Sequence, residues 1–290
     1  MKYNKVVEFV NQILSQYTIL LTLRQIFYRL VANYDYPNKK SAYIQLSKQL
    51  VKARERKHID GTRIEDRSRG FLGGDHGFSN PKDFLNLQIK EFLSSPEYYH
   101  RNMWAVQPEF VIVWIEKDAL SRVVSTVAKE FNVITCPSRG YASYTYVMEA
   151  LAMLPEEKEI TVLHFADHDP SGLDMTRDLE ARISEYSELD VTVERVALNY
   201  DQVQYYELPP NPAKHADPRA EEYVTIYGNE CWELDAIDPD EHQRLVFVSI
   251  LEHIDTKIWD KTIDEEAKET QWLEKIFSEI RENFQKMGLL

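Results

Sequence analysis

The run Glu159-Ile160-Thr161-Val162-Leu163-His164-Phe165-Ala166-Asp167-His168-Asp169-Pro170-Ser171-Gly172 is the most informative part of this 290-residue chain. Its first seven residues are typical of a buried strand. Pro170 and Ser171 suit the start of a helix, Pro in the first turn and Ser as its cap. Alternate side chains of an extended segment share a face, so Asp167 and Asp169 are predicted to point the same way. Two such acids, followed by a glycine that lets the backbone turn, suit a divalent cation.

Strands and helices alternate on both sides of this run. Further strands are predicted at residues 110–115, 133–136 and 191–198, with helices at 118–131, 144–154 and 173–187. Apolar strands that alternate with helices indicate a parallel sheet covered on both faces, so the fold class is α/β. An irregular, proline-rich loop is expected at 207–228, and acidic helices from about residue 240 to the end.

The first hundred residues have a different pattern. Helices are predicted at 2–15, 23–32 and 41–57, with Thr22 as a cap and a further helix at 81–93. Five of the nine glycines lie between Gly61 and Gly77, among several arginines, as in a hairpin or wing. Three helices followed by a basic hairpin predict a winged-helix DNA-binding domain at residues 1–105, followed by a second domain at 106–290.

The charge is divided unevenly between these parts. The whole chain has a net charge of −14, but residues 1–110 carry 17 Lys and Arg against 11 Asp and Glu. Such asymmetry favours a basic surface for a polyanion beside a separate acidic part; a solvated helix face is the alternative. The two cysteines have no zinc-ligand spacing and suggest a reducing, cytoplasmic setting. No apolar run approaches the ~20 residues of a membrane helix, so no membrane association is expected.

A third acid joins the pair at the end of the strand. Glu116 follows the predicted strand 110–115 as Asp167 follows 159–165. Because carboxyl ends of parallel strands meet at one edge, Glu116, Asp167 and Asp169 are expected to form an all-oxygen site. Oxygen ligands suit Mg²⁺, or Mn²⁺, and phosphate chemistry. A solvated strand-end acid is the alternative for each residue taken singly.

This arrangement resembles the Toprim domain of type IA and type II topoisomerases, bacterial primases and some nucleases. The resemblance rests on Glu116 at the end of one strand and Asp167-x-Asp169-x-x-Gly172 at the end of another. It implies a Rossmann-like parallel sheet with a Mg²⁺-dependent site that acts on nucleic-acid phosphates. The helices after about residue 240 would then be a C-terminal extension.

Tyr28 is the candidate nucleophile in the N-terminal domain. It lies about 130° from the centre of the apolar stripe of its helix, so it is not expected in the core. Arg24 lies one turn earlier on the same side. A phenol with a pKa near 10 is a weak nucleophile at neutral pH, and a guanidinium favours its phenolate and binds phosphate. A packed surface tyrosine is the alternative, and Tyr34 and Tyr36 compete for the role.

Arg24-Gln25-Ile26-Phe27-Tyr28 is similar to the Arg-Asp-Ile-Tyr/Phe-Tyr motif of the topoisomerase VI A subunit and the related meiotic double-strand-break transesterase. The resemblance implies that Tyr28 attacks DNA and forms a 5′-phosphotyrosyl end. Gln25 replaces the usual Asp, and Gly140-Tyr141-Ala142 replaces a Gly-x-Pro. The stretches 206–214 and 233–237 resemble small family members from phages and mobile elements, without an assigned role.

The sequence therefore predicts a type IIB topoisomerase A-like enzyme that cleaves double-stranded DNA, associated with DNA in the cytoplasm. Tyr28 is expected to attack phosphorus with the help of Arg24, and the resemblance implies that Glu116 returns a proton to the leaving oxygen. The resemblance implies a homodimer, and any ATP dependence would need a separate GHKL-type ATPase subunit, since no Walker loop is present. Backbone contacts are expected from basic residues: Arg29, Lys48, Lys52, Arg54, Arg56, Arg63, Arg67 and Lys214.

Two other functions stay open. One is a Toprim nuclease that uses water, with Tyr28 as a bystander. The other is a non-catalytic DNA-binding or assembly factor.

Overall fold

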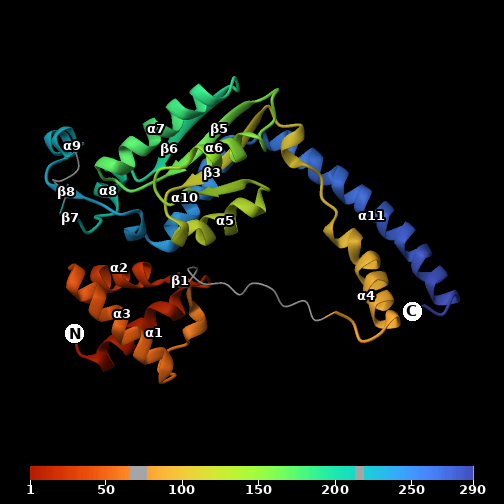
Figure 1. Cartoon of the computed structure of the whole chain (residues 1–290), viewed down its shortest axis with the longest axis horizontal. Coiled ribbons are helices and arrows are strands. Elements are labelled where there is room, and N and C mark those ends of the chain that lie inside the picture. The colour runs from red at the N-terminus through yellow and green to blue at the C-terminus, as the bar shows by residue number, and fades with distance from the viewer. Residues whose placement is uncertain (66–76, 213–218, 290) are drawn as a thin grey trace. The chain divides into compact units, whose positions relative to one another are not determined.

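A computed structural model describes residues 1–65, 77–212 and 219–289. The chain forms two compact units (Figure 1). Unit 1 consists of Met1–Ser68 and Pro108–His253, and unit 2 of Arg69–Gln107 and Ile254–Leu290. The first helices thus group with the sheet, and residues 69–107 group with the C-terminus. The domain border expected at 105/106 lies close to one border between these units, Gln107/Pro108.

Unit 1 begins with three helices: α1 (Tyr3–Gln16), α2 (Leu23–Tyr34) and α3 (Lys40–Glu55). The predicted cap is confirmed, because the Thr22 side chain accepts from the Gln25 backbone and the Gln25 side chain accepts from the Thr22 N–H. The strand β1 (Leu21–Thr22) pairs in parallel with β2 (Ile64–Glu65), which follows the 3₁₀ turn η1 (Gly61–Arg63). The predicted wing falls mostly on residues 66–76, outside the described residues, so a winged helix stays a prediction.

The second part of unit 1 is built on the predicted parallel sheet. Its strands are β3 (Glu109–Ile115), β4 (Ile134–Pro137), β5 (Glu159–Phe165) and β6 (Val191–Ala197), in the order β4-β3-β5-β6. All three pairings are parallel, as predicted. Ile115 lies opposite Phe165, so the chain leaves β3 and β5 at the same level.

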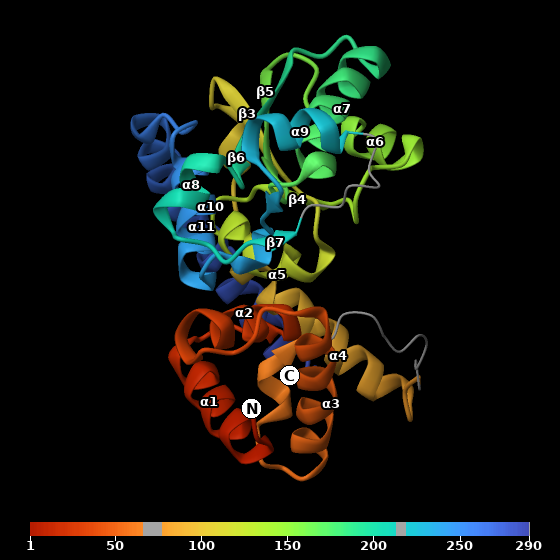
Figure 2. The ribbon, with the colours of Figure 1, turned by 90° about the vertical axis from the view of Figure 1, so that its left-hand side faces the viewer.

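Helices cover both faces of this sheet (Figures 1 and 2). On one face, α6 (Tyr144–Leu151) and α7 (Pro170–Tyr186) pack on apolar side chains that include Ile112 and Val162. The other face is covered by α5 (Ser121–Glu130), which follows the 3₁₀ turn η4 (Asp118–Leu120), and by α10 (Pro239–Leu251). Each fully buried Val, Leu or Ile contributes about 1.5–3 kcal/mol to the stability of this core.

The expected proline-rich loop is more ordered than predicted. After α8 (Tyr200–Tyr205), β7 (Asn211–Pro212) pairs antiparallel with β8 (Glu230–Cys231), and α9 (Ala220–Tyr227) lies between them in sequence. The 3₁₀ turn η5 (Leu234–Ala236) then leads into α10. The prolines do not prevent α9, because its eight residues contain none.

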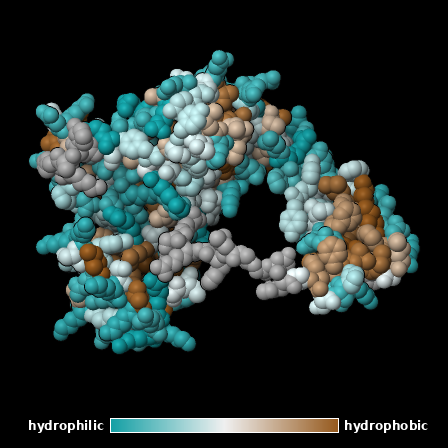
Figure 3. All heavy atoms as spheres, in the orientation of Figure 1, coloured by the Kyte–Doolittle hydropathy of each residue, from teal (hydrophilic) through white to brown (hydrophobic). Residues whose placement is uncertain are grey.

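Unit 2 contains α4 (Pro81–Ser94), the 3₁₀ turns η2 (Ser95–Tyr98) and η3 (Met103–Ala105), and the long helix α11 (Thr256–Lys286). The Phe92 and Phe277 rings meet with centroids 5.0 Å apart, and Arg101 pairs with Glu265 and Glu269. Apolar side chains also gather on the outside of this unit (Figure 3), among them Phe84, Leu85 and Leu87. Within the described residues, no helix has the length and apolar character needed to cross a membrane.

Candidate active site

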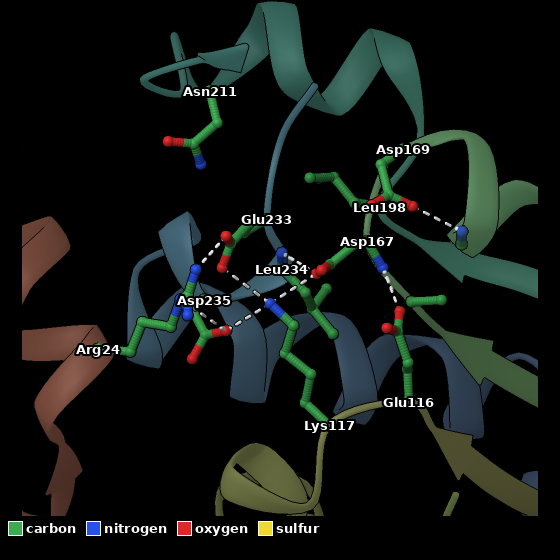
Figure 4. A network of polar contacts seen from close by, with 12 residues as sticks. Arg24, Glu116, Lys117, Asp167, Asp169, Leu198, Asn211, Glu233, Leu234 and Asp235 are labelled. Carbon is green, nitrogen blue, oxygen red and sulfur yellow. Dashed lines mark hydrogen bonds and ion pairs between the residues drawn. The ribbon is translucent and has the colours of Figure 1, made fainter. Parts of the chain in front are cut away.

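Glu116 and Asp167 meet at the carboxyl edge of the sheet, as predicted. The Glu116 N–H donates to the Phe165 carbonyl at 2.9 Å, which continues the β3–β5 pairing past the strand ends. The Asp167 N–H then donates to Glu116 Oε2 at 3.0 Å (Figure 4). Two segments 51 residues apart in sequence are thereby joined through one carboxylate.

Asp169 caps a helix, and its predicted role as a metal ligand stays a prediction. Its Oδ1 accepts hydrogen bonds from the Gly172 N–H at 2.7 Å and from Ser171 Oγ at 2.8 Å, so Asp169 is the N-cap of α7. The expectation that Ser171 caps this helix was wrong, because the carboxylate satisfies the orphan N–H instead. In Figure 4 the Asp169 carboxylate turns towards the start of α7 and that of Asp167 turns towards Lys117.

Lys117 is a central residue that the sequence analysis missed. Its Nζ lies 2.8 Å from Asp167 Oδ1, 3.1 Å from Glu233 Oε2 and 2.6 Å from Asp235 Oδ2. Its side chain is 18% exposed. Burial opposes its charge, but the three carboxylates outweigh burial and raise the pKa of Lys117 well above its usual value. Lys117 therefore stays charged and holds three acids together.

The segment after β8 supplies the acids that sequence reasoning could not place. Glu233 pairs with Arg24 as well as with Lys117, so the network extends into α2. Asp235 is 1% exposed, and its Oδ1 has no hydrogen-bond partner. The Leu234 N–H donates to Asp167 Oδ1 at 2.8 Å, which fixes this segment to the strand end. The acids of 233–237 were visible in the sequence, but no periodicity connects them to residue 117.

The electrostatics of this network favour an added cation. Burial raises the pKa of Asp167 to about 7 and also raises the pKa of Glu116. Arg195 donates to the Ala166 and Asp167 carbonyls at 3.1 and 2.6 Å, and burial lowers its pKa to about 10. When ionised, the network has five carboxylates and three cations. The carboxylates are those of Glu116, Asp167, Asp169, Glu233 and Asp235, and the cations are Arg24, Lys117 and Arg195.

A divalent ion would balance this charge and keep the buried acids ionised. Their oxygen donors suit Mg²⁺ or Mn²⁺. The predicted three-ligand set is nevertheless not assembled. Among the described residues, no group of three or more His, Cys, Asp or Glu side chains is arranged to hold a metal. The reason is local, since Lys117 holds Asp167 while the start of α7 holds Asp169. The donor set thus fits a divalent ion in charge and type, and the metal site stays a prediction.

Tyr28 is buried, which corrects the expectation that it lies outside the core. Only 2% of it is exposed, and its hydroxyl accepts a hydrogen bond from Asn211 Nδ2 at 2.8 Å. Burial and the nearby Glu233 raise its pKa to about 12, against the opposing effects of Asn211, Arg24 and Lys117. Arg24 therefore favours the phenolate, as expected, but does not outweigh burial.

The predicted DNA contacts separate into two groups. Arg29 is 8% exposed and donates to Asp238 Oδ2 at 2.8 Å and to the Ala236 carbonyl at 2.6 Å. Arg63 donates to the carbonyls of Leu14 and Tyr17. These two arginines bond to other parts of the fold, and their contact with DNA stays a prediction. Lys48, Lys52 and Arg56 are exposed and Arg54 is half-buried, while Arg67 and Lys214 lie outside the described residues.

An open pocket of about 760 Å³ lies between the first helices and the strand ends of unit 1. Glu116, Lys117 and Asp235 line it from one side, and Arg24 and Tyr43 from the other. Tyr28, Asp167 and Asp169 are not among its lining residues. The pocket thus gives access to one end of the acid network.

No protein-family model matches this sequence, and no curated protein matches it either. The resemblance to the topoisomerase VI A family therefore rests on the motifs alone and stays a prediction.

Proposed function

We propose that this protein is a DNA-cleaving transesterase whose nucleophile is Tyr28 and whose phosphate site is the acid network of Glu116, Lys117 and Asp167. The observation that carries the proposal is the position of the Tyr28 phenol. It lies one helical turn after Arg24, which pairs with Glu233, and Glu233 also pairs with Lys117, which holds Asp167. The motif that resembles a nucleophile and the motif that resembles a metal corner thus belong to one polar network.

The reaction exchanges one phosphate ester for another. The Tyr28 oxygen forms a bond to phosphorus, the bond from phosphorus to the 3′ oxygen breaks, and the DNA 5′ end stays on the tyrosine. The phenol loses its proton and the leaving oxygen gains one. Asn211, Arg24 and Lys117 favour the phenolate that attacks.

A Mg²⁺ or Mn²⁺ ion bound by Glu116, Asp167 and Asp169 would stabilise the charge that develops on the phosphate. Double-strand cleavage needs two copies of the site, so the proposal includes a homodimer. A separate ATPase subunit and a cytoplasmic location on DNA stay predictions from the resemblance.

The burial of Tyr28 favours a second candidate function, a nuclease that uses water. A phenol that is 2% exposed and absent from the pocket wall reaches a phosphate only after the segment at Asn211 moves away. Water needs no such movement to enter the pocket. The two functions differ in the product, because hydrolysis leaves free ends and transesterification leaves protein on the 5′ end.

One cleavage experiment separates these functions. Supercoiled plasmid is incubated with the protein and Mg²⁺ or Mn²⁺, the reaction is stopped with detergent, and 5′ ends are tested for attached protein. Tyr28→Phe loses one hydrogen bond, which costs about 1 kcal/mol, so it stays folded. It is expected to abolish the adducts, whereas the control Tyr34→Phe, which loses a bond to Gln12 instead, is expected to keep them.

Each outcome has a clear meaning. Free ends that Tyr28→Phe does not affect would reject the transesterase and support the nuclease. DNA retention without cleavage in either metal would support a non-catalytic DNA-binding factor. Asp167→Asn is expected to abolish cleavage and spare DNA binding; cleavage that persists in this variant would remove Asp167 from the site.

A further inference from the structure

Tyr43 is the aromatic residue on the wall of the open pocket, and the proposed reaction gives it no role. It comes from α3, whereas Glu116 and Lys117 line the pocket from the end of β3. It is half-buried, so it combines a packed ring with access to the pocket.

The Tyr43 ring is fixed by its neighbours. Phe27 meets it edge to face, with ring centroids 5.3 Å apart and an interplanar angle of 88°. The guanidinium carbon of Arg24 lies 5.7 Å from the ring centroid, within the range of a cation–π contact. Arg24 is itself held by Glu233. A ring packed in this way loses little conformational entropy when it binds a planar group, which favours affinity.

The pocket lining carries both signs of charge, and Arg139 is the most exposed of its three cations, which are Arg24, Lys117 and Arg139. Arg139 lines the pocket, and its side chain is 75% exposed although it pairs with Asp118 at 3.0 Å. Ion pairs so open to solvent are weak, so this guanidinium can exchange its partner for a phosphate at small cost. An aromatic ring and an exposed arginine that line the same pocket suit a nucleotide, whose base stacks while its phosphate pairs.

The size of the pocket limits what enters. Its volume of about 760 Å³ lies in the range of roughly 300–1,000 Å³ typical of small-molecule sites. A pocket of this volume has room for a nucleotide. A base reaches the face of an aromatic ring only after it has left the stack of its neighbours.

We propose that Tyr43 and Arg139 bind one unstacked nucleotide of the DNA strand, with its base against the Tyr43 ring and its phosphate at Arg139. This inference rests on the proposed action on DNA. It adds a substrate-binding role for Tyr43 that needs the ring and not the hydroxyl.

The test uses oligonucleotides that carry 2-aminopurine at successive positions, bound to the full chain with Tyr28→Phe so that no adduct forms. The fluorescence at one or two adjacent positions is expected to change on binding. Tyr43→Phe is expected to keep this signal. Tyr43→Ala is expected to lose it and to raise Kd roughly 5-fold to 150-fold, the range for loss of one stacked base. Tyr34→Ala, on α2 and outside the pocket lining, is the matched control.

Two further arms complete the design. Arg139→Ala is expected to weaken oligonucleotide binding and to reduce the dependence of binding on salt. The Arg139 side chain is exposed, so its removal is not expected to unfold the protein. Thymidine monophosphate separates a strand from a free nucleotide. If thymidine monophosphate competes only weakly with the oligonucleotide, the site binds a nucleotide within a strand, as proposed. If thymidine monophosphate binds as tightly as the oligonucleotide, the proposal is overturned.

The inference is overturned if Tyr43→Ala binds and changes fluorescence as its parent does, or if Arg139→Ala leaves both affinity and salt dependence unchanged. It is also overturned if the hydroxyl matters, that is, if Tyr43→Phe in the otherwise unaltered chain loses covalent adducts. Its failure differs from failure of the transesterase. Protein–DNA adducts that depend on Tyr28 report on the reaction, whereas the 2-aminopurine signal reports on Tyr43 with or without adducts.

Discussion

Lys117 is the side chain whose loss should disturb unit 1 most, because its ammonium group is shared by Asp167, Glu233 and Asp235. In Lys117→Met the aliphatic stem is replaced by a chain of similar length, and only the charge and its hydrogen bonds are lost. The three carboxylates then face one another without their common cation. Asp235, at 1% exposure, has the least water to compensate.

The size of the effect follows from the geometry. Unit charges about 3 Å apart attract by roughly 5–6 kcal/mol at an effective dielectric constant near 20. Desolvation and repulsion among the acids cancel much of this attraction. Removal of one partner from a buried ion pair typically costs about 3–5 kcal/mol, and we expect that loss of unfolding free energy for Lys117→Met at pH 7.

The assay is urea denaturation followed by tryptophan fluorescence in the presence of a chelator. Lys48→Met, at an exposed position of α3, is the matched control and should change stability by less than about 0.5 kcal/mol. Adding Asp235→Asn to Lys117→Met should recover part of the loss, because it removes one of the unpaired charges. If Lys117→Met unfolds at the same urea concentration as Lys48→Met, the network does not stabilise the fold and the reasoning is refuted.

Three other perturbations give contrasting outcomes. Arg29→Met should lower the unfolding free energy by about 3 kcal/mol, since it removes the ion pair with Asp238 and the hydrogen bond to the Ala236 carbonyl, whereas Arg56→Met should only weaken DNA binding; equal stabilities in denaturation would contradict this. Gly172→Ala places a Cβ 2.1 Å from the Asp167 carbonyl oxygen and should destabilise by about 1–3 kcal/mol. Gly61→Ala meets only the flexible Arg54 side chain at 3.2 Å and should cost less, a ranking that melting temperatures check. The folded-state pKa of Asp167, about 7, exceeds the unfolded value of about 3.9. Its contribution is therefore present below pH 4 and is lost as pH rises to 7, so with a chelator Asp167→Asn should flatten the pH profile of stability between pH 4 and 7; an unchanged profile would argue against the shift.

The sheet was predictable because its strands are apolar runs with clear ends. The bounds of β5 agree with the prediction at both ends, and β3 differs by one residue at its start. The contact between Glu116 and Asp167 also followed, since parallel pairing brings the two strand ends to the same edge.

The site was harder to predict because its other residues depend on tertiary contacts. A helical wheel places Tyr28 away from the apolar stripe of its own helix, but Tyr28 is 2% exposed in the fold and its hydroxyl accepts a hydrogen bond from Asn211, far away in sequence. Arg29 and Arg63 are basic residues in a basic stretch, and sequence gives no sign that backbone carbonyls and Asp238 bind them. Lys117 stands beside Glu116 with no pattern that connects it to Asp235.

The way in which the first three helices are attached limits their modularity. Tyr17 and Arg29 both donate hydrogen bonds to Asp238. Arg24 pairs with Glu233, and the Tyr28 hydroxyl accepts a hydrogen bond from Asn211. An isolated fragment of residues 1–68 would expose an arginine and a tyrosine shaped to meet another part of the chain. Exchange of this segment between related proteins would therefore have to carry the residues around 211 and 233–238 with it, so recombination would transfer Arg24, Tyr28 and Arg29 together with their partners as a set.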